Sequence, residues 1–193
     1  MITAEHIKAL RDKTGVSISE CKKALEEAQG DEAKALEVLM ARAAASVGKK
    51  ADRVLGAGAV ASYLHGTGQV GAMVLLSCET DFVSKNEEFV ALARDVAMQV
   101  AATDPKYSTI DEVPEEARRA ATEVFQKEVA GKPAEMQAKI LEGKMTSYFQ
   151  DQVLLDQPFI KDETKTMRTL LNEATQKFGE RVEVSRFARL SAR

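Results

Sequence analysis

The segment from Val70 to Val100 most constrains the fold, because it changes from a strand pattern to a helix pattern across one short connector. Residues 70–78 are largely apolar on both alternating faces, which predicts a strand that is buried on both sides. Further along, apolar residues recur at helical spacing and predict one buried stripe of a long helix. These residues are Phe89, Leu92, Ala93, Val96, Ala97 and Val100.

An acid and a large aromatic, Asp81 and Phe82, lie in the connector between this strand and this helix. Connectors generally run over the protein surface, so a phenylalanine is unusual there. For a chain without relatives, the simplest interpretation is that Phe82 folds back as a local plug.

The flanking segments predict a small antiparallel sheet. Residues 59–65 alternate as a strand, Gly66–Gln69 form a turn, and Val70 begins the return strand, so a hairpin is expected. Residues 181–190 alternate as a last strand, with a shift of parity between Val184 and Phe187 that predicts a bulge. We expect this strand to complete a sheet with the hairpin and the helices to pack on one side. The predicted fold class is α+β, with a core over residues 57–193.

Residues 1–45 predict three short helices. Thr3 and Asp31 are caps for the first and third, and Ser17-Ile18-Ser19-Glu20 is a capping box for the second. Three helices of this length bury little apolar surface alone, and they resemble a ubiquitin-associated-type module. Residues 46–56 (SVGKKADRVLG) lack periodicity and predict a basic linker, open to being partly helical.

The segment 114–149 predicts several short helices. Pro114 is expected at the first position of one of them, with an inner stripe of Ala117, Ala121, Val124, Phe125 and Val129. Gly143 is expected to break the following helix, in which Met136 and Ile140 would point inward.

Few residues suggest catalysis or a bound cofactor. Gly66, Gly68 and Gly71 match the spacing of a dinucleotide-binding loop, but that loop needs a helix after it, and here a strand follows. His6 and His65 are the only histidines and lie on different segments. We therefore expect no metal site, no cofactor and no enzymatic activity.

Composition excludes several other classes of function. A net charge of −3 gives no overall basic field, so nucleic acid is not an expected partner. The longest apolar run is too short to span a bilayer, and residues 1–15 lack a signal-peptide core. Cys21 and Cys78 are not spaced as paired metal ligands and are expected as buried, reduced thiols of a cytoplasmic protein.

Three ordered strings resemble the elongation factor Ts family. The most specific is Thr80-Asp81-Phe82-Val83 followed by Lys85-Asn86-Glu87-Glu88-Phe89. The other two are Thr14–Leu25, with Cys21-Lys22-Lys23-Ala24-Leu25, and Leu155–Asp162 within Val153-Leu154-Leu155-Asp156-Gln157-Pro158-Phe159-Ile160-Lys161-Asp162.

This resemblance implies a factor that binds elongation factor Tu, a GTPase, and promotes release of its GDP. Asp81 and Phe82 would disturb the magnesium-coordinating region of the GTPase, with Thr80 and Val83 fixing their position. The amino-terminal module would grip the nucleotide-binding domain of the partner. Its expected contact residues are Arg11, Val16, Ile18, Ser19 and Lys22.

The chain departs from the family pattern in two ways. Many members carry two methionines where this chain has Ile18-Ser19, and Ser19 cannot make the same apolar contact. Longer members duplicate the core and add a coiled coil, whereas this chain has room for one copy, so a homodimer would present a second core surface. The alternative function is that of an adaptor, which binds a protein through the helical module without driving nucleotide exchange.

Overall fold

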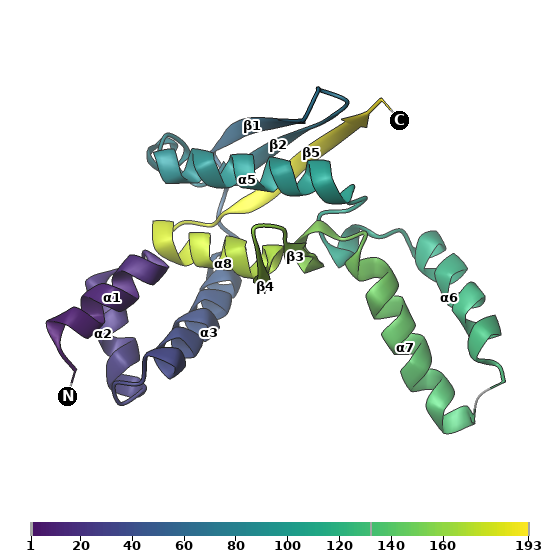
Figure 1. Cartoon of the computed structure of the whole chain (residues 1–193), viewed down its shortest axis with the longest axis horizontal. Coiled ribbons are helices and arrows are strands. Elements are labelled where there is room, and N and C mark those ends of the chain that lie inside the picture. Colours follow the sequence, from purple (N-terminus) through teal and green to yellow (C-terminus); the bar gives the residue numbers. More distant parts are fainter. Residues whose placement is uncertain (1, 132, 193) are drawn as a thin grey trace.

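Figure 1 shows the computed structural model of the chain, which describes residues 2–131 and 133–192, apart from the side chains of residues 134 and 135. A small antiparallel sheet lies beside one long helix, and helical arms extend from this centre toward both ends of the molecule. The predicted α+β class is confirmed. Within the described ranges, no helix combines the length and apolar character needed to cross a bilayer.

The amino-terminal module consists of three helices, each of which begins at the cap that the sequence predicts. They are α1 (Ala4–Thr14), α2 (Ile18–Glu27) and α3 (Glu32–Lys50). The side chains of Thr3, Ser17 and Asp31 each accept a hydrogen bond from the backbone N–H three residues ahead, which satisfies a donor that the helix leaves open. The helices bury Leu10, Cys21, Ala24, Leu25 and Leu39 between them.

The predicted capping box forms only in part. Glu20 does not reach back to Ser17; its carboxylate contacts Lys23 at 3.0 Å and Arg42 of α3 at 3.1 Å. The hydrogen bond from Lys23 lowers the pKa of Glu20, and the charge of Arg42 acts in the same direction. The guanidinium competes successfully for the carboxylate because charge-assisted hydrogen bonds are the stronger ones.

The third helix is longer than its apolar pattern predicts. Because α3 continues to Lys50, residues 46–50 of the expected linker are helical, and 51–56 are irregular. Helix α3 packs against α8 (Met167–Phe178) of the core, and the ammonium of Lys50 donates to the carbonyl oxygen of Thr175 at 3.3 Å. Burial lowers the pKa of Lys50, and the nearby charge of Arg53 lowers it further. The division at residues 45 and 56 stays a prediction.

Three strands form the main sheet, in the order β1-β2-β5. They are β1 (Ala57–His65), β2 (Val70–Cys78) and β5 (Glu183–Ser191). β1 and β2 form the predicted hairpin, and β5 pairs antiparallel with β2. The predicted bulge is also confirmed: Leu76 lies opposite Val184 and Leu75 opposite Arg186, so Ser185 is an extra residue in β5.

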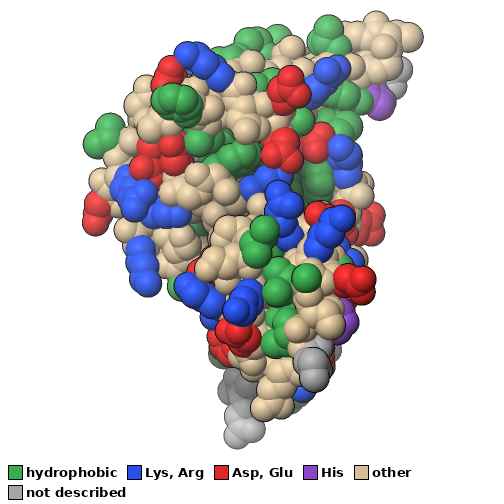
Figure 2. Space-filling model, turned by 90° about the vertical axis from the view of Figure 1, so that its left-hand side faces the viewer, with side chains coloured by type: hydrophobic (Ala, Val, Ile, Leu, Met, Phe, Trp, Pro, Cys, Tyr) green, Lys and Arg blue, Asp and Glu red, His purple; other side chains and the backbone are tan. Residues whose placement is uncertain are grey.

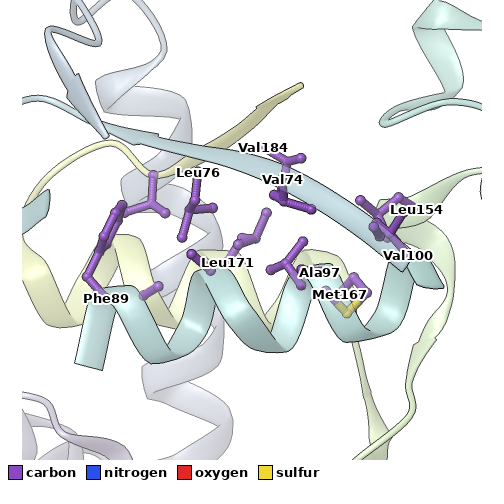
Figure 3. Close-up of a cluster of buried hydrophobic side chains, with 14 of the residues drawn as sticks. Val74, Leu76, Phe89, Ala97, Val100, Leu154, Met167, Leu171 and Val184 are labelled. Carbon is purple, nitrogen blue, oxygen red and sulfur yellow. The ribbon is translucent and has the colours of Figure 1, made fainter. Parts of the chain in front are cut away.

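The hydrophobic core lies between one face of this sheet and two helices, α5 (Glu87–Thr103) and α8. Figure 3 shows side chains from β2, β5, α5 and α8 pointing toward one another in this layer. The buried members include Val74, Leu76, Phe89, Ala97, Val100, Leu154, Met167, Leu171 and Val184. The helical stripe predicted for residues 89–100 is confirmed, and Asn86 caps α5 by accepting from the N–H of Glu88.

The opposite face of the sheet is uncovered, which contradicts the prediction that β2 is buried on both sides. Ala72, Val74 and Leu76 face the core, whereas Met73, on the other face of the same strand, is 56% exposed. Runs of apolar residues on both parities normally mark a strand with layers on both sides. Here the second layer is missing from the described chain, and the apolar face remains open.

Two helices form a hairpin that projects from the core on the side away from the amino-terminal module (Figure 1). They are α6 (Glu115–Val129), preceded by Pro114 at the cap position, and α7 (Ala134–Gln150). The predicted break at Gly143 is wrong, since α7 runs through it; one helical glycine costs only about 1 kcal/mol. Val124 and Met136, predicted to point inward, are 55% and 53% exposed. Ala121 and Val129 of α6 and Phe149 of α7 are buried residues of this hairpin.

The segment after α7 returns to the core through short elements. They are η2 (Leu154–Asp156), β3 (Pro158–Phe159) and β4 (Asp162–Thr166). Another short helical turn, η1 (Ile110–Glu112), lies earlier in the chain, just before α6. The buried amide of Gln99 in α5 donates to Gln157 and to the carbonyl of Pro158, and its oxygen accepts from the N–H of Ile160. These bonds hold this segment against α5.

Candidate functional site

The connector between β2 and α5 forms a short helix of its own, α4 (Asp81–Ser84). Thr80, the residue before α4, has an extended backbone conformation. Asn86, two residues after α4 ends, caps α5. Asp81 and Phe82 therefore stand on one helical turn at the end of the sheet. Asp81 pairs with Lys85 at 2.6 Å, and this hydrogen bond lowers the pKa of Asp81, so the carboxylate is ionised at neutral pH.

Phe82 is 88% exposed, so the interpretation of a local plug is wrong. The following residue, Val83, is partly buried and packs against the hydrophobic core, which turns the phenyl ring of Phe82 outward. An exposed aromatic adds little to the stability of its own chain but becomes a strong contact when a partner covers it.

Thr80 is held by hydrogen bonds on three atoms. Its N–H donates to Oε2 of Glu180 at 3.0 Å, and its hydroxyl donates to Oε1 of the same carboxylate. Its carbonyl oxygen accepts from the thiol of Cys78 at 3.2 Å. Burial raises the pKa of Cys78, and the charge of Glu180 raises it further, so the thiol keeps the proton that it donates.

Glu79 and Arg181 extend this network, which sequence reasoning missed. The carboxylate of Glu79 accepts from the N–H of Arg181 at 2.6 Å and from the guanidinium of Arg53 at 3.1 Å. The N–H of Arg181 lowers the pKa of Glu79 most, and Arg53 adds to the effect. The signal in the sequence is weak: a charged pair, Glu180-Arg181, between a helix end at Gly179 and the last strand.

Four of the five residues expected to contact a partner in the amino-terminal module are exposed. Arg11 lies on α1, and Ile18, Ser19 and Lys22 lie on the first turns of α2; Ile18 is 59% exposed. Val16 differs, because it is buried in the core of the module at 5% exposure. Its side chain stabilises the module and offers almost no surface to another molecule.

The amino-terminal module and the start of α5 lie toward the same side of the molecule (Figure 1). Contacts connect them: Lys177 of α8 pairs with Glu88 of α5 at 2.6 Å, and its aliphatic chain lies against the turn at Gly15. Gly15 has φ +67°, a backbone conformation that favours glycine, and an added Cβ would also have to displace the end of the Lys177 side chain. On this side of the molecule, basic and acidic side chains alternate, with apolar side chains between them (Figure 2).

The glycine pattern at Gly66, Gly68 and Gly71 lies in the β1–β2 hairpin. Gly66 and Gly68 adopt positive φ in the turn, and Gly71 is inside β2. Without a helix amino terminus beside it, this turn lacks the geometry that binds a pyrophosphate. Cys21 and Cys78 are buried and free. Among the side chains that the structure describes, no three His, Cys, Asp or Glu residues are grouped closely enough to hold a metal ion.

Comparison with known proteins decides the family. The family profile described as "Elongation factor TS" matches residues 5–193. Proteins named Elongation factor Ts align over nearly the whole chain. One from Carboxydothermus hydrogenoformans is 43% identical over 98% of this chain and 88% of its own length. Another from Thermosipho melanesiensis is 44% identical over 99% of this chain and 98% of its own length. The chain belongs to the elongation factor Ts family.

Membership of the elongation factor Ts family makes this chain a translation elongation factor, and the three motif strings now have places in its fold. Thr14–Leu25 spans the end of α1 and most of α2, and Glu79–Phe89 spans α4 and the start of α5. Leu155–Asp162 is the segment held on α5 by Gln99. The first two strings each combine buried core residues with exposed side chains, such as Ile18 and Phe82, whereas the third is held against α5.

Proposed function

We propose that this protein is the nucleotide exchange factor of elongation factor Tu: it binds the GDP-bound GTPase in the cytoplasm and promotes release of GDP. It acts through binding alone and is not an enzyme. The observation that carries the proposal is Phe82, 88% exposed beside an ionised Asp81 on a helix fixed to the sheet. Such a rigid apolar projection can enter another molecule without losing much conformational freedom on binding.

The thermodynamic basis of exchange is linkage. A protein that binds the nucleotide-free GTPase more tightly than the GDP form weakens GDP binding by the same coupling free energy. A thousandfold weakening needs roughly 4 kcal/mol of differential contact, since each factor of ten is about 1.4 kcal/mol. Burial of Phe82 supplies about 2–3 kcal/mol. The remainder must come from other contacts, and the exposed Arg11, Ile18, Ser19 and Lys22 are the proposed source.

Two side chains on α4 have different proposed roles. Magnesium neutralises the phosphate oxygens of bound GDP, so displacing it weakens the nucleotide without direct contact. Phe82 would push apart the segment that holds the metal, and the carboxylate of Asp81 would compete for that segment's polar groups. Thr80 and Val83 keep both in position, through hydrogen bonds and core packing respectively.

Stopped-flow fluorescence tests this proposal directly. A purified bacterial elongation factor Tu is loaded with a fluorescent GDP, and release is followed with and without this protein. Acceleration that saturates with protein concentration is the expected result. The adaptor alternative predicts a complex on a sizing column with an unchanged release rate, and that combination would overturn the exchange function.

We also propose that two copies associate through the open face of the sheet. The register places Val60 beside Leu75 and Leu64 beside Gly71 and Leu190, all on this face. Val60, Leu64 and Leu190 are 65%, 72% and 79% exposed. A contiguous apolar face of this kind is rare on monomers, and two such sheets can pack face to face at about 10 Å.

Light scattering tests the dimer. Leu190→Glu places a charge on the open face and should convert a dimer into a monomer. Val90→Glu, at a position of α5 that is 45% exposed, is the control and should leave the dimer intact. A strict monomer that still accelerates GDP release would defeat the proposed dimer and leave the exchange function standing.

A further inference from the structure

We propose that Glu180 is a positioning residue for nucleotide exchange: its carboxylate fixes the amino-terminal end of α4 and thereby the direction of Phe82. This inference rests on the proposed exchange function and adds a residue that lies outside all three family strings. Glu180 is in the connector between α8 and β5, about a hundred positions along the chain from Thr80.

The first step is that α4 cannot hold itself. It has four residues, no side-chain cap and no buried residue. A single helical turn has an unfavourable nucleation free energy, so its order must come from outside it. The chain enters this turn through Glu79 and Thr80, which directly precede its first residue, Asp81.

The second step is that one carboxylate serves this end. Oε2 of Glu180 accepts from the N–H groups of both Glu79 and Thr80, each at 3.0 Å, and Oε1 accepts from the hydroxyl of Thr80. Hydrogen bonds to a charged acceptor are worth more than neutral ones. Three of them on two consecutive residues define the direction in which the chain enters α4.

The third step is that the connector around Glu180 is itself fixed. The guanidinium of Arg181 donates to the carbonyl oxygens of Ala51 and Arg53 at 2.6 and 3.0 Å. The N–H of Val182 donates to the hydroxyl of Thr175 at 3.2 Å. Because the two residues after Glu180 are anchored and α8 ends at Phe178, two residues before it, Glu180 is held by the folded core rather than on a long flexible loop.

The test measures GDP release and amide exchange on four proteins: wild type, Glu180→Ala, Glu180→Gln and Glu112→Ala. Glu112 is the matched control, since its carboxylate also accepts a backbone N–H, that of Ser108, but beside α6. Glu180→Ala removes all three hydrogen bonds and should slow GDP release at least about tenfold, the loss expected even for one charge-assisted hydrogen bond. Glu180→Gln keeps a carbonyl oxygen for both N–H groups and an amide for the hydroxyl, so it should stay within about threefold of wild type.

A double-mutant cycle separates positioning from general stabilisation. If Glu180 acts through the phenyl ring, Glu180→Ala should have less than about a twofold effect in a Phe82→Ala background. An equal effect in both backgrounds would overturn the proposal. The proposal would also be overturned if Glu180→Ala released GDP at the wild-type rate, or if Glu180→Gln released it as slowly as Glu180→Ala.

Amide exchange of the free protein keeps the test independent of the partner. The N–H groups of Ser84, Lys85 and Asn86 donate to the carbonyl oxygens of Thr80, Asp81 and Val83, and not to Glu180. Their protection should fall about tenfold in Glu180→Ala and stay unchanged in Glu112→Ala. If wild type fails to accelerate GDP release, the exchange function fails, while unchanged protection at these three amides would refute the positioning role by itself.

Discussion

Phe82 and Ile18, the two exposed apolar side chains proposed to meet the partner, are carried by helices that are stabilised in opposite ways. Ile18 begins α2, a ten-residue helix with Ser17 as its cap and three buried residues of its own. Phe82 is on α4, which has four residues, no side-chain cap and no buried residue. The first helix is supported by residues close to it in sequence. The second is supported by distant parts of the chain: Val83 packs against the core, and Glu180, about one hundred positions away, binds Thr80.

A helix stabilised by nearby residues and a helix stabilised by distant residues depend on different parts of the fold. A cap such as Ser17 contributes about 1 kcal/mol to its own helix and depends on nothing beyond the next few residues. The hydrogen bonds at Thr80 exist only when β5 and the connector before it are in place. The direction of Phe82 therefore depends on the folded core, whereas Ile18 depends on the module alone.

The largest effect is expected for Phe82→Ala. If α4 is the main source of differential contact, removing the ring should slow GDP release roughly 30- to 150-fold, which corresponds to the about 2–3 kcal/mol of its burial. Since the ring is 88% exposed, the melting temperature should hardly change. Stopped-flow release and calorimetry measure both quantities.

Val124→Ala is the matched control for this change. Val124 is also an exposed apolar side chain, at 55%, but it lies on α6 at the far end of the molecule. Its removal should leave release unchanged. Equal rates for wild type and Phe82→Ala would remove Phe82 from the mechanism and make the module the principal contact.

A smaller effect is expected for Ile18→Ala. Ile18, at the start of α2, is 59% exposed, and Ser19 beside it adds no apolar area. Burial of Ile18 should therefore contribute about 1 kcal/mol to binding of the partner, which is roughly fivefold in affinity. Because the module is proposed to grip rather than to displace magnesium, the change should appear in the half-saturating concentration. Ile160→Ala, at a 38% exposed position beside β3, is the control. A loss as large as that of Phe82→Ala would invert the comparison.

The difference between the two helices also explains how much could be predicted from the sequence. Thr3, Ser17 and Asp31 act within three residues of their partners, so the pattern of the chain contains the whole interaction. The hairpin and the bulge in β5 were predictable for the same reason, since alternation and its shift of parity are local. The exposure of α4 was not.

Interactions between distant segments account for what the sequence did not reveal. The role of Glu180 depends on a contact across about a hundred residues, and apolar periodicity does not encode it. The residues of β2 are apolar on both faces, which predicts that Met73 is buried. Its exposure depends on whether another layer covers that face of the sheet, and the sequence of the strand does not contain this information. Val16 was grouped with exposed neighbours because the resemblance names a segment, while the packing of α1 on α2 decides which of its side chains is buried.

The smallest effects concern two carboxylates, one near each helix. The pKa values of Glu79 and Glu20 both lie below their ordinary value of 4.5, so in each case folding favours the charged form. Both contributions to the free energy of unfolding are therefore present at neutral pH. They are lost as the pH falls from 4.5 through the lowered pKa. Glu79→Gln and Glu20→Gln should each destabilise the protein at neutral pH, and the difference from wild type should shrink in acid.

Salt separates the two sites, because their pKa values are lowered by different partners. The main cause at Glu79 is the N–H of Arg181, a neutral backbone group, whereas at Glu20 it is the exposed ammonium of Lys23. In about 1 M salt the Debye length is about 3 Å, so exposed charge pairs are screened and backbone hydrogen bonds are not. Urea unfolding should show that salt removes most of the effect of Glu20→Gln and little of the effect of Glu79→Gln. Equal loss at both sites would mean that Arg53, rather than the backbone of Arg181, is the main partner of Glu79, and the support of α4 would then be as salt-sensitive as that of α2.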